Sequence, residues 1–368
     1  MSDKLCRWGI LGTAGIARKN WQAIYNAPNA TLMGVASRDL GRSQQYIDEC
    51  QTTVAFATPP RAFGSYEELI ESPDIDAVYT PIPTTVRKEW VIRAAEAGKH
   101  VMCEKPCGVT VADVEEMIAI CESNGVQFMD GVMFMHSQRM QKLRELLDDG
   151  ESVGDIKRIV THFTFRADEA WLAEDIRTSS DLEPLGALGD LGWYTLRMPL
   201  LIMNYETPQR VTGRLLTELG QAASPEKVPV EFSGELLWDG GVSCSFYCSF
   251  LTEHSQLTHV SGTRGHLQIS DYVLPFFGSE LAINVSNSHF ELVGSDFMME
   301  EHLRREPVRE YSNSRPNSQE TKLFENFSDL VLSGKRDSFW PEVALQTQRV
   351  MEACLESARS GSVVVNMS

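Results

Sequence analysis

The sequence has few positive charges for its length and no long apolar run. Its 368 residues include 33 Lys and Arg against 51 Asp and Glu, which gives a formal net charge of −18 at pH 7. Nucleic acids and anionic membranes are bound largely by Lys and Arg, so this balance argues against both as partners. No apolar stretch reaches the ~18–20 residues that a membrane-spanning helix needs.

The sequence also shows no pattern typical of a secretory leader or of a disulfide framework. The N-terminus shows no basic segment followed by an apolar one, so we expect a cytoplasmic protein. Eight cysteines spread through a chain of this length are typical of buried thiols. The pairs Cys103/Cys107 and Cys244/Cys248 lack partners at the spacing of zinc ligands, so we predict no metal.

The composition is that of an ordinary globular protein, with 42% hydrophobic and 23% charged residues. The length predicts two domains, at about 150 residues per domain. Six apolar runs separated by helical patterns precede residue 133. They are Trp8–Leu11, Ala30–Ser37, Thr53–Ala57, Ala77–Thr80, His100–Cys103 and Gln127–Val132. This alternation predicts βαβ units and a doubly wound parallel sheet of the Rossmann type.

The pattern changes to successive Thr-, Val- and Phe-rich runs after about residue 150. These runs predict an α+β domain with a mostly antiparallel, open-faced sheet. We therefore expect a nucleotide-binding domain over 1–130 and a substrate-binding and dimerisation domain over 131–368. Two helices, Glu320–Ser333 and Pro341–Arg359, close the chain and could pack back on the first domain. The polar stretch Arg304–Gln319 predicts a surface loop.

A glycine-containing turn follows the first predicted strand and leads directly into a helix. Its residues Gly12, Thr13, Ala14, Gly15 and Ile16 are the predicted phosphate contacts. Gly12 would make the tight turn, and Gly15 would let a pyrophosphate approach the amides at the helix N-terminus. Ala14 stands where the dinucleotide-binding fingerprint prefers glycine.

The end of the second predicted strand favours NADP over NAD. The NAD fingerprint expects an acidic residue there for the ribose hydroxyl, but the sequence has Ser37 and Arg38, with Arg42 one turn further on. A guanidinium pairs well with a 2′-phosphate and a serine hydroxyl can add a hydrogen bond. Asp39 leaves a ribose contact, and so NAD, open as the alternative.

Three residues predict the chemistry of proton and hydride transfer. Lys105 follows the strand His100–Cys103, at the strand end where ligands of such sheets bind. Asp190 and Tyr194 stand four residues apart in a predicted helix over 188–203, so they should share one face. A tyrosine hydroxyl can pass the proton of a carbinol, and a nearby cation lowers its pKa.

The order of these motifs resembles the Gfo/Idh/MocA family of oxidoreductases. The matching segments span nearly the whole chain. They are Gly9–Ala17, Ala95–Pro106 with its Glu-Lys-Pro sequence, Gly189–Tyr194 and the C-terminal region 340–361. The tyrosine in the third segment resembles the form found in dimeric dihydrodiol and D-xylose dehydrogenases and in glucose-fructose oxidoreductase.

The resemblance assigns roles to residues at matching positions. It implies cofactor contacts for Glu104 and Lys105, and a catalytic role for Lys105, Asp190 and Tyr194. Pro81, Ile82 and Pro83 would lie near the nicotinamide. Substrate contacts would come from Arg177, Asp190 and Tyr194, and Trp171 is a candidate for stacking on a sugar ring. Two departures stand out, Arg87 in place of a histidine and Phe134-Met135-His136 in place of an aromatic-Arg pair.

These observations predict an NADP-dependent oxidoreductase. It would transfer a hydride between nicotinamide and a carbinol carbon of a monosaccharide, sugar derivative or cyclic polyol. One alternative is a glycosidase of the same superfamily that uses a bound nicotinamide without net turnover. Another is a non-enzymatic NADP-sensing protein. The resemblance also implies a homodimer formed through the open sheet face.

Overall fold

The computed structural model describes residues 4–367 and divides them into two compact units. The first unit contains the described residues up to His136, together with Asp181–Pro184 and Tyr311–Gln348. The second contains Ser137–Ser180, Leu185–Glu310 and the described residues from Arg349 onward. Each unit therefore combines three separate segments of the chain, whereas the sequence predicted a single boundary at residue 130.

The first unit is built on a six-stranded sheet in which every pairing is parallel. Its strands are β1 (Cys6–Leu11), β2 (Ala30–Ala36), β3 (Arg61–Phe63), β4 (Ala77–Thr80), β5 (His100–Cys103) and β6 (Phe128–Asp130). The spatial order β3-β2-β1-β4-β5-β6 is that of the Rossmann fold, and the order reverses between β1 and β4. The predicted third strand, Thr53–Ala57, is wrong, because helix α2 runs to Thr53 and β3 begins at Arg61.

Seven α-helices of the described chain belong wholly or partly to this unit, and several of them begin at a residue whose side chain caps the helix. They are α1 (Gly15–Asn26), α2 (Leu40–Thr53), α3 (Tyr66–Ile70), α4 (Thr84–Glu96), α5 (Val111–Ser123), α9 (Gln319–Ser333) and the first half of α10 (Phe339–Arg359). The Ser65 hydroxyl caps α3 by accepting a hydrogen bond from the Glu68 amide at 3.1 Å. Thr110 and Asp113 form a capping box at α5.

The C-terminal helix α9 completes the core of the first unit. The Trp8 ring of β1 packs against Phe324 at 4.9 Å and Phe327 at 5.1 Å, and its indole N–H donates to Ser328 Oγ at 3.0 Å. Trp8 is fully buried, so residues from opposite ends of the chain form one core. This packing is the reason that 311–348 belongs to the first unit and not to the predicted second domain.

The stretch 304–319 is not the surface loop that its polarity predicts. Residues 303–308 form strand β16, and Ser312, Ser314 and Ser318 are buried. Hydrogen bonds explain how polar residues are accommodated there. The Ser314 carbonyl, for example, accepts from Asn26 Nδ2 at 2.7 Å and from Thr321 Oγ1 at 3.2 Å.

The second unit contains a nine-stranded, mostly antiparallel sheet with the order β16-β13-β12-β11-β7-β10-β9-β8-β17. Its strands are β7 (Ile156–Thr164), β8 (Arg210–Gln221), β9 (Ser224–Leu237), β10 (Ser243–Ser249), β11 (Ser255–Gly262), β12 (His266–Ile269), β13 (Leu281–Ser286), β16 (Leu303–Val308) and β17 (Val365–Asn366). Only the β7–β10 pairing among these described strands is parallel. The predicted fold class is confirmed.

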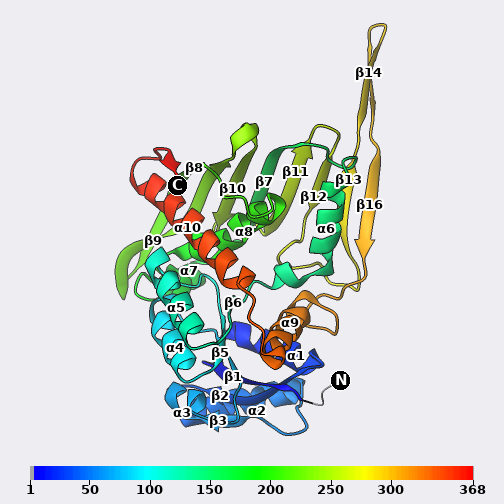
Figure 1. The fold of residues 1–368 in the computed structure, drawn as a ribbon. Helices are drawn as coiled ribbons and strands as arrows, with labels where there is room; N and C mark the ends of the chain where they lie inside the picture. Colours follow the sequence, from blue (N-terminus) through cyan, green and yellow to red (C-terminus); the bar gives the residue numbers. More distant parts are fainter. Residues whose placement is uncertain (1–3, 368) are drawn as a thin grey trace. The chain divides into compact units, whose positions relative to one another are not determined.

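Helices cover one face of this sheet. In Figure 1, α6 (Gln138–Asp148) and α8 (Trp193–Ile202) lie on the same side of it, and α6 contacts β13 and β16 while α8 contacts β7 and β10. A short helix, α7 (Glu169–Glu174), and three irregular turns complete the unit. The turns are η2 (Ile176–Thr178), η3 (Leu188–Gly192) and η4 (Asp239–Gly241). No helix among residues 4–367 combines the length and hydropathy needed to cross a membrane.

Candidate cofactor and active site

The glycine turn after β1 has the conformation that a tight approach to a ligand requires. Gly12 has φ = +106°, a region open to glycine and strained for other residues. A Cβ there would lie 3.0 Å from the Cγ2 of Ile82 in the loop after β4. Gly12 therefore lets the loops after β1 and β4 meet at the point where the strand order reverses.

The N-terminus of α1 is open to an anion. Its N-cap, Ala14, provides no side-chain hydrogen bond, and no acidic residue lies in the first turn. A Cβ on Gly15 would meet no atom within 4 Å, and Ile16 is exposed. The first amides of a helix carry partial positive charge and need partners. The residues present therefore fit the pyrophosphate of a dinucleotide.

The predicted 2′-phosphate residues lie beside this turn. Arg42 Nε donates to Thr13 Oγ1 at 2.9 Å, which brings the start of α2 against the glycine turn. The carboxylate of Asp39 caps α2 by accepting from the Arg42 amide at 2.7 Å. Ser37 is buried, and its hydroxyl bonds to the backbone of Asp39. Asp39, the alternative ribose contact, thus already has a structural role.

Tyr66 is a neighbour of this region that the sequence reasoning missed. Its hydroxyl would lie 3.6 Å from a Cβ on Gly12. Burial raises the pKa of Tyr66, and the positive charges of Arg38 and Arg42 partly offset that rise. These three side chains therefore share one electrostatic environment. The position of Tyr66 in the sequence did not indicate this contact, because Tyr66 and the glycine turn are distant in sequence and meet only in the folded protein.

Arg87 replaces the histidine that is usual in the family at this position, and it ties two loops of the site together. Its side chain is buried, and Nε and Nη2 donate to the Ile82 carbonyl at 3.1 and 2.5 Å. Nη1 donates to Thr84 Oγ1 at 3.1 Å and also to the Pro106 carbonyl. The loop after β4 is therefore joined to the loop that carries Lys105.

Glu104 holds the backbone beside Lys105. The buried carboxylate accepts from the Tyr79 hydroxyl at 2.5 Å and from the Lys105 amide at 3.1 Å. Asn20 of α1 donates to the same tyrosine oxygen at 2.7 Å. Burial, together with the Glu104 charge, raises the pKa of Tyr79 well above its usual value. Glu104 therefore orients the backbone at Lys105, and its contact with the cofactor, which the resemblance implied, stays a prediction.

Asp190 and Tyr194 lie in the second unit, where Arg177 is an ion-pair partner of Asp190. The Arg177 Nε is 3.3 Å from Asp190 Oδ2, and its Nη1 is 3.1 Å from Asp175 Oδ1. The negative charge of Asp190 is the main cause of a raised pKa at Arg177. The ion pair with Arg177 orients the Asp190 carboxylate.

Tyr194 stands at the junction of two helical forms. Residues Leu188–Gly192 form a π-helical turn and α8 begins at Trp193, so the predicted helix over 188–203 is present but starts with a wider turn. That Asp190 and Tyr194 share one face stays a prediction. Tyr194 is 6% exposed, and its ring packs edge-on against Phe163 at 5.7 Å.

Trp171 belongs to an aromatic cluster. Its ring packs edge-on against Phe165 at 5.3 Å and Phe250 at 5.0 Å. Phe134, Met135 and His136, which stand in place of the aromatic-Arg pair, lie in the 3₁₀ turn Met133–His136. His136 stacks on Trp340 at 4.6 Å and bonds Asn326 at 2.9 Å, both within the first unit.

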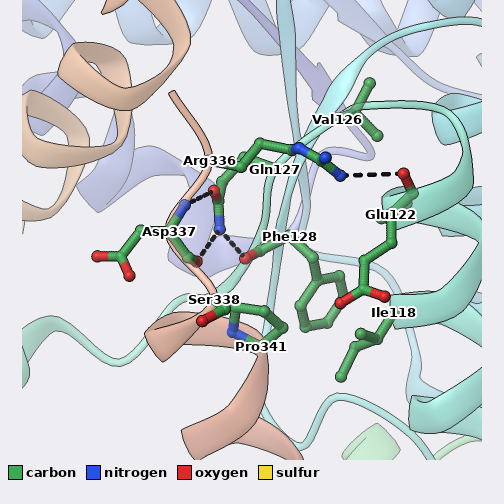
Figure 2. A pocket seen from close by; sticks show the side chains of 10 residues that line it. Ile118, Glu122, Val126, Gln127, Phe128, Arg336, Asp337, Ser338 and Pro341 are labelled. Atoms are coloured by element: carbon green, nitrogen blue, oxygen red, sulfur yellow. Dashed lines mark hydrogen bonds between the residues drawn. The ribbon is translucent and has the colours of Figure 1, made fainter. Parts of the chain in front are cut away.

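A cavity of about 390 Å³ lies in the first unit at the amino-terminal end of β6 (Figure 2). It is lined by α5, the start of β6 and residues 336–341. Gln127 binds the backbone of Asp337 through two hydrogen bonds of 3.0 and 2.8 Å, and Arg336 donates to the Glu122 carbonyl at 2.9 Å. The cofactor motif follows the carboxyl ends of the strands, so this cavity is separate from it.

The fold and these residues define a two-unit protein with a Rossmann domain built to hold a dinucleotide. The comparisons identify its family. Residues 6–132 match the model described as the oxidoreductase family with an NAD-binding Rossmann fold, GFO_IDH_MocA, and residues 140–268 match the C-terminal domain of the same family. The chain belongs to the Gfo/Idh/MocA family of oxidoreductases.

Two curated relatives cover most of the chain. D-xylose 1-dehydrogenase (NADP(+)) 2 from Haloferax volcanii is 29% identical over 359 residues, which are 97% of this chain and 98% of that protein. Trans-1,2-dihydrobenzene-1,2-diol dehydrogenase from Mus musculus is 30% identical over 295 residues, 79% of this chain and 82% of that protein.

Solved structures share the fold over nearly the whole chain. An aldose-aldose oxidoreductase from Caulobacter crescentus has a TM-score of 0.78 at 24% identity, with 99% of this chain and all of that chain covered. A 3-ketoreductase from Actinomadura kijaniata, solved with NADP and TDP-benzene, has a TM-score of 0.76 at 23% identity, with 97% and 98% covered.

Proposed function

We propose that the protein is an NADP-dependent oxidoreductase. It transfers a hydride between the nicotinamide and a carbinol carbon of a monosaccharide, sugar derivative or cyclic polyol. The observation that carries this proposal is the uncapped N-terminus of α1 with Arg42 bound to Thr13 beside it. One of the relatives is a D-xylose 1-dehydrogenase (NADP(+)) and another is a dihydrodiol dehydrogenase, which supports both the cofactor and the substrate class.

Phosphate binding is the proposed role of the turn residues. Gly12, Thr13, Ala14, Gly15 and Ile16 present backbone amides to the pyrophosphate. Arg42, with Arg38 and Ser37, recognises the 2′-phosphate. Pro81, Ile82 and Pro83 border the nicotinamide, and Arg87 holds that loop through the Ile82 carbonyl. When bound, the nicotinamide accepts the hydride in the oxidation direction and supplies it in reduction.

Proton transfer is the proposed role of Tyr194. In the oxidation direction its oxygen removes the proton of the substrate hydroxyl, and Lys105 stabilises the negative charge that develops on the oxygen. Asp190 orients the reacting groups, and its own orientation is set by Arg177 at 3.3 Å. We propose that Arg177 acts mainly through Asp190 and that Trp171 is a candidate for stacking on the sugar ring.

Two further properties belong to this proposal. The nine-stranded sheet has an open face with a shallow cavity of about 220 Å³ over β7, β8, β9 and β10, and we propose that this face forms a homodimer. We also propose a cytoplasmic location. A glycosidase without net cofactor turnover and a non-enzymatic sensor are not favoured, because the named relatives are dehydrogenases and reductases.

The variant Tyr194→Phe tests the proton-transfer role. We expect turnover to fall by at least ~100-fold, the usual contribution of a general acid-base group. NADPH affinity should stay within about twofold of the wild type, since the tyrosine lies outside the phosphate-binding turn. Turnover is followed by nicotinamide absorbance and affinity by quenching of tryptophan fluorescence. Unchanged turnover would contradict the assignment.

A further inference from the structure

A two-stranded hairpin extends the second unit without cover from other parts of it. Strands β14 (His289–Val293) and β15 (Asp296–Glu300) pair only with each other, and all ten residues are exposed. Figure 1 shows this hairpin standing beyond β13 and β16. We call residues 289–300 the arm. Two strands alone are marginally stable in water, so an uncovered arm is expected to have a partner surface.

One face of the arm is apolar. Residues that pair across the strands share a face, and the pairs Phe290–Met299 and Leu292–Phe297 are neighbours on it. These four side chains are 54%, 66%, 59% and 74% exposed, in that order. The two phenylalanine rings stack at 5.8 Å. Together the side chains present roughly 500 Å² of apolar surface, a size that on a monomer usually marks a binding surface.

The other face of the arm is acidic. Its cross-strand pairs are His289–Glu300, Glu291–Met298 and Val293–Asp296. Three carboxylates on this face favour contact with water. The apolar face is therefore the one expected to contact a partner, because burying apolar side chains is favourable and burying carboxylates is not.

The register of the arm places its apolar face on the open side of the sheet. The pairing of β13 with β16 ends at Ser286–Leu303, and His289–Glu300 continues in the same register. Between these two pairs, the Asn287 amide donates to the His302 carbonyl at 3.2 Å, so β13 and β16 continue into the arm without a bulge. Side chains alternate along a strand, and Phe290 has the parity of exposed Asn284, opposite to that of buried Ile283 and Val285.

A matching apolar surface lies at the other end of β13. Leu274, Phe276 and Phe277, in the loop before β13, are 40%, 64% and 85% exposed. The arm follows the C-terminal end of β13 and this loop precedes its N-terminal end. A two-fold axis perpendicular to β13 therefore brings the arm of each copy against the loop of the other copy. The same two surfaces meet twice, so the contact is isologous.

We propose that the arm clasps a second copy of this chain, with its apolar face seated on the partner's loop 274–277. The proposal rests on the homodimer proposed above and adds the element that stabilises it. Two arms and the two surfaces that they cover bury roughly 1,600–2,000 Å² in total, which is the range of specific protein interfaces.

Neighbouring methionines provide a matched pair of variants. Met299→Gln changes the apolar face and Met298→Gln the acidic face, and both residues are exposed. The dissociation constant of the full-length dimer is measured by sedimentation as a function of concentration. We expect Phe297→Ser to raise it by about 100-fold, since both arms lose an anchor, and Met299→Gln by about 10-fold. Met298→Gln should leave it within about twofold, and Phe277→Ser should weaken it as Phe297→Ser does.

The outcomes separate the arm from the dimer itself. A wild-type dimer that the arm variants do not weaken would overturn the arm and leave the open-face dimer standing. Weakening by Phe297→Ser with none by Phe277→Ser would overturn the loop as the acceptor. A wild type that stays monomeric at high concentration would overturn both. Far-ultraviolet circular dichroism of each variant controls for folding.

Discussion

At the scale of single residues, polar side chains hold the loops after the strands of the first unit. Arg87 joins the loop after β4 to the loop after β5, and Glu104 fixes the amide of Lys105. The sequence predicts the glycine turn and the place of Lys105, because both follow from local spacing. It could not predict the partners of Arg87, since these bonds depend on how loops distant in sequence meet. The Arg177–Asp190 pair escaped prediction for the same reason.

The variant Arg42→Ala tests cofactor choice. A hydrogen bond between charged groups contributes about 1.5–3 kcal/mol, so the dissociation constant for NADP should rise ~10–100-fold. The constant for NAD, which lacks the 2′-phosphate, should change by less than about threefold. Isothermal titration with both nucleotides measures the two values.

Arg18→Ala is the matched control for that substitution. Arg18 lies on α1 and forms an exposed ion pair with Glu49 of α2 at 2.5 Å. Its removal should leave both dissociation constants unchanged. Equal losses for NADP and NAD in Arg42→Ala would contradict the 2′-phosphate role.

At the scale of elements, the C-terminal helix α9 is fastened to α1 by one buried ion pair. Lys19 Nζ lies 2.6 Å from Glu320 Oε1, and the Glu320 side chain is only 2% exposed. Burial raises the pKa of Glu320, but the Lys19 charge and hydrogen bonds outweigh it, so the net pKa is lowered. The sequence predicted the helix and its limits within one residue. The contact with α1 spans 300 residues and could not be predicted from it.

The variant Glu320→Gln should destabilise the protein at neutral pH. A depressed native pKa contributes stability that is present above the usual value of 4.5 and is lost as the pH falls through the native pKa. We expect a loss of about 1–3 kcal/mol in unfolding free energy near pH 7, and a difference from wild type that shrinks in acid. Urea unfolding at a series of pH values measures both.

Glu325→Gln on the same helix is the control. Glu325 forms a partly exposed pair with Lys322 at 3.0 Å, three residues apart. Such pairs contribute little, so the loss should stay below about 0.5 kcal/mol. A pH-independent difference between Glu320→Gln and wild type would show that the ion pair is not the cause.

At the scale of the whole molecule, two sheets of different kinds are assembled from a chain that passes repeatedly between units. The alternation of strands and helices predicted the parallel sheet, because each βα unit leaves a local signal. Strand β16 was missed, since its charged residues resemble a loop. The packing of Trp8 against Phe324 and Phe327 agrees with the expectation that the C-terminal helices could pack back on the first domain, but periodicity gives no sign of which residues meet.

The most direct test of the central claim is net nicotinamide turnover by the full-length protein. Wild type is incubated with NADP or NAD and with a panel of monosaccharides and cyclic polyols, and reduced nicotinamide is followed by absorbance while the sugar product is quantified. We predict that at least one substrate reduces NADP in a one-to-one ratio with product, faster than NAD, and that Tyr194→Phe abolishes the reaction. Conversion of a sugar without net reduced cofactor, or a clear preference for NAD, would contradict the account.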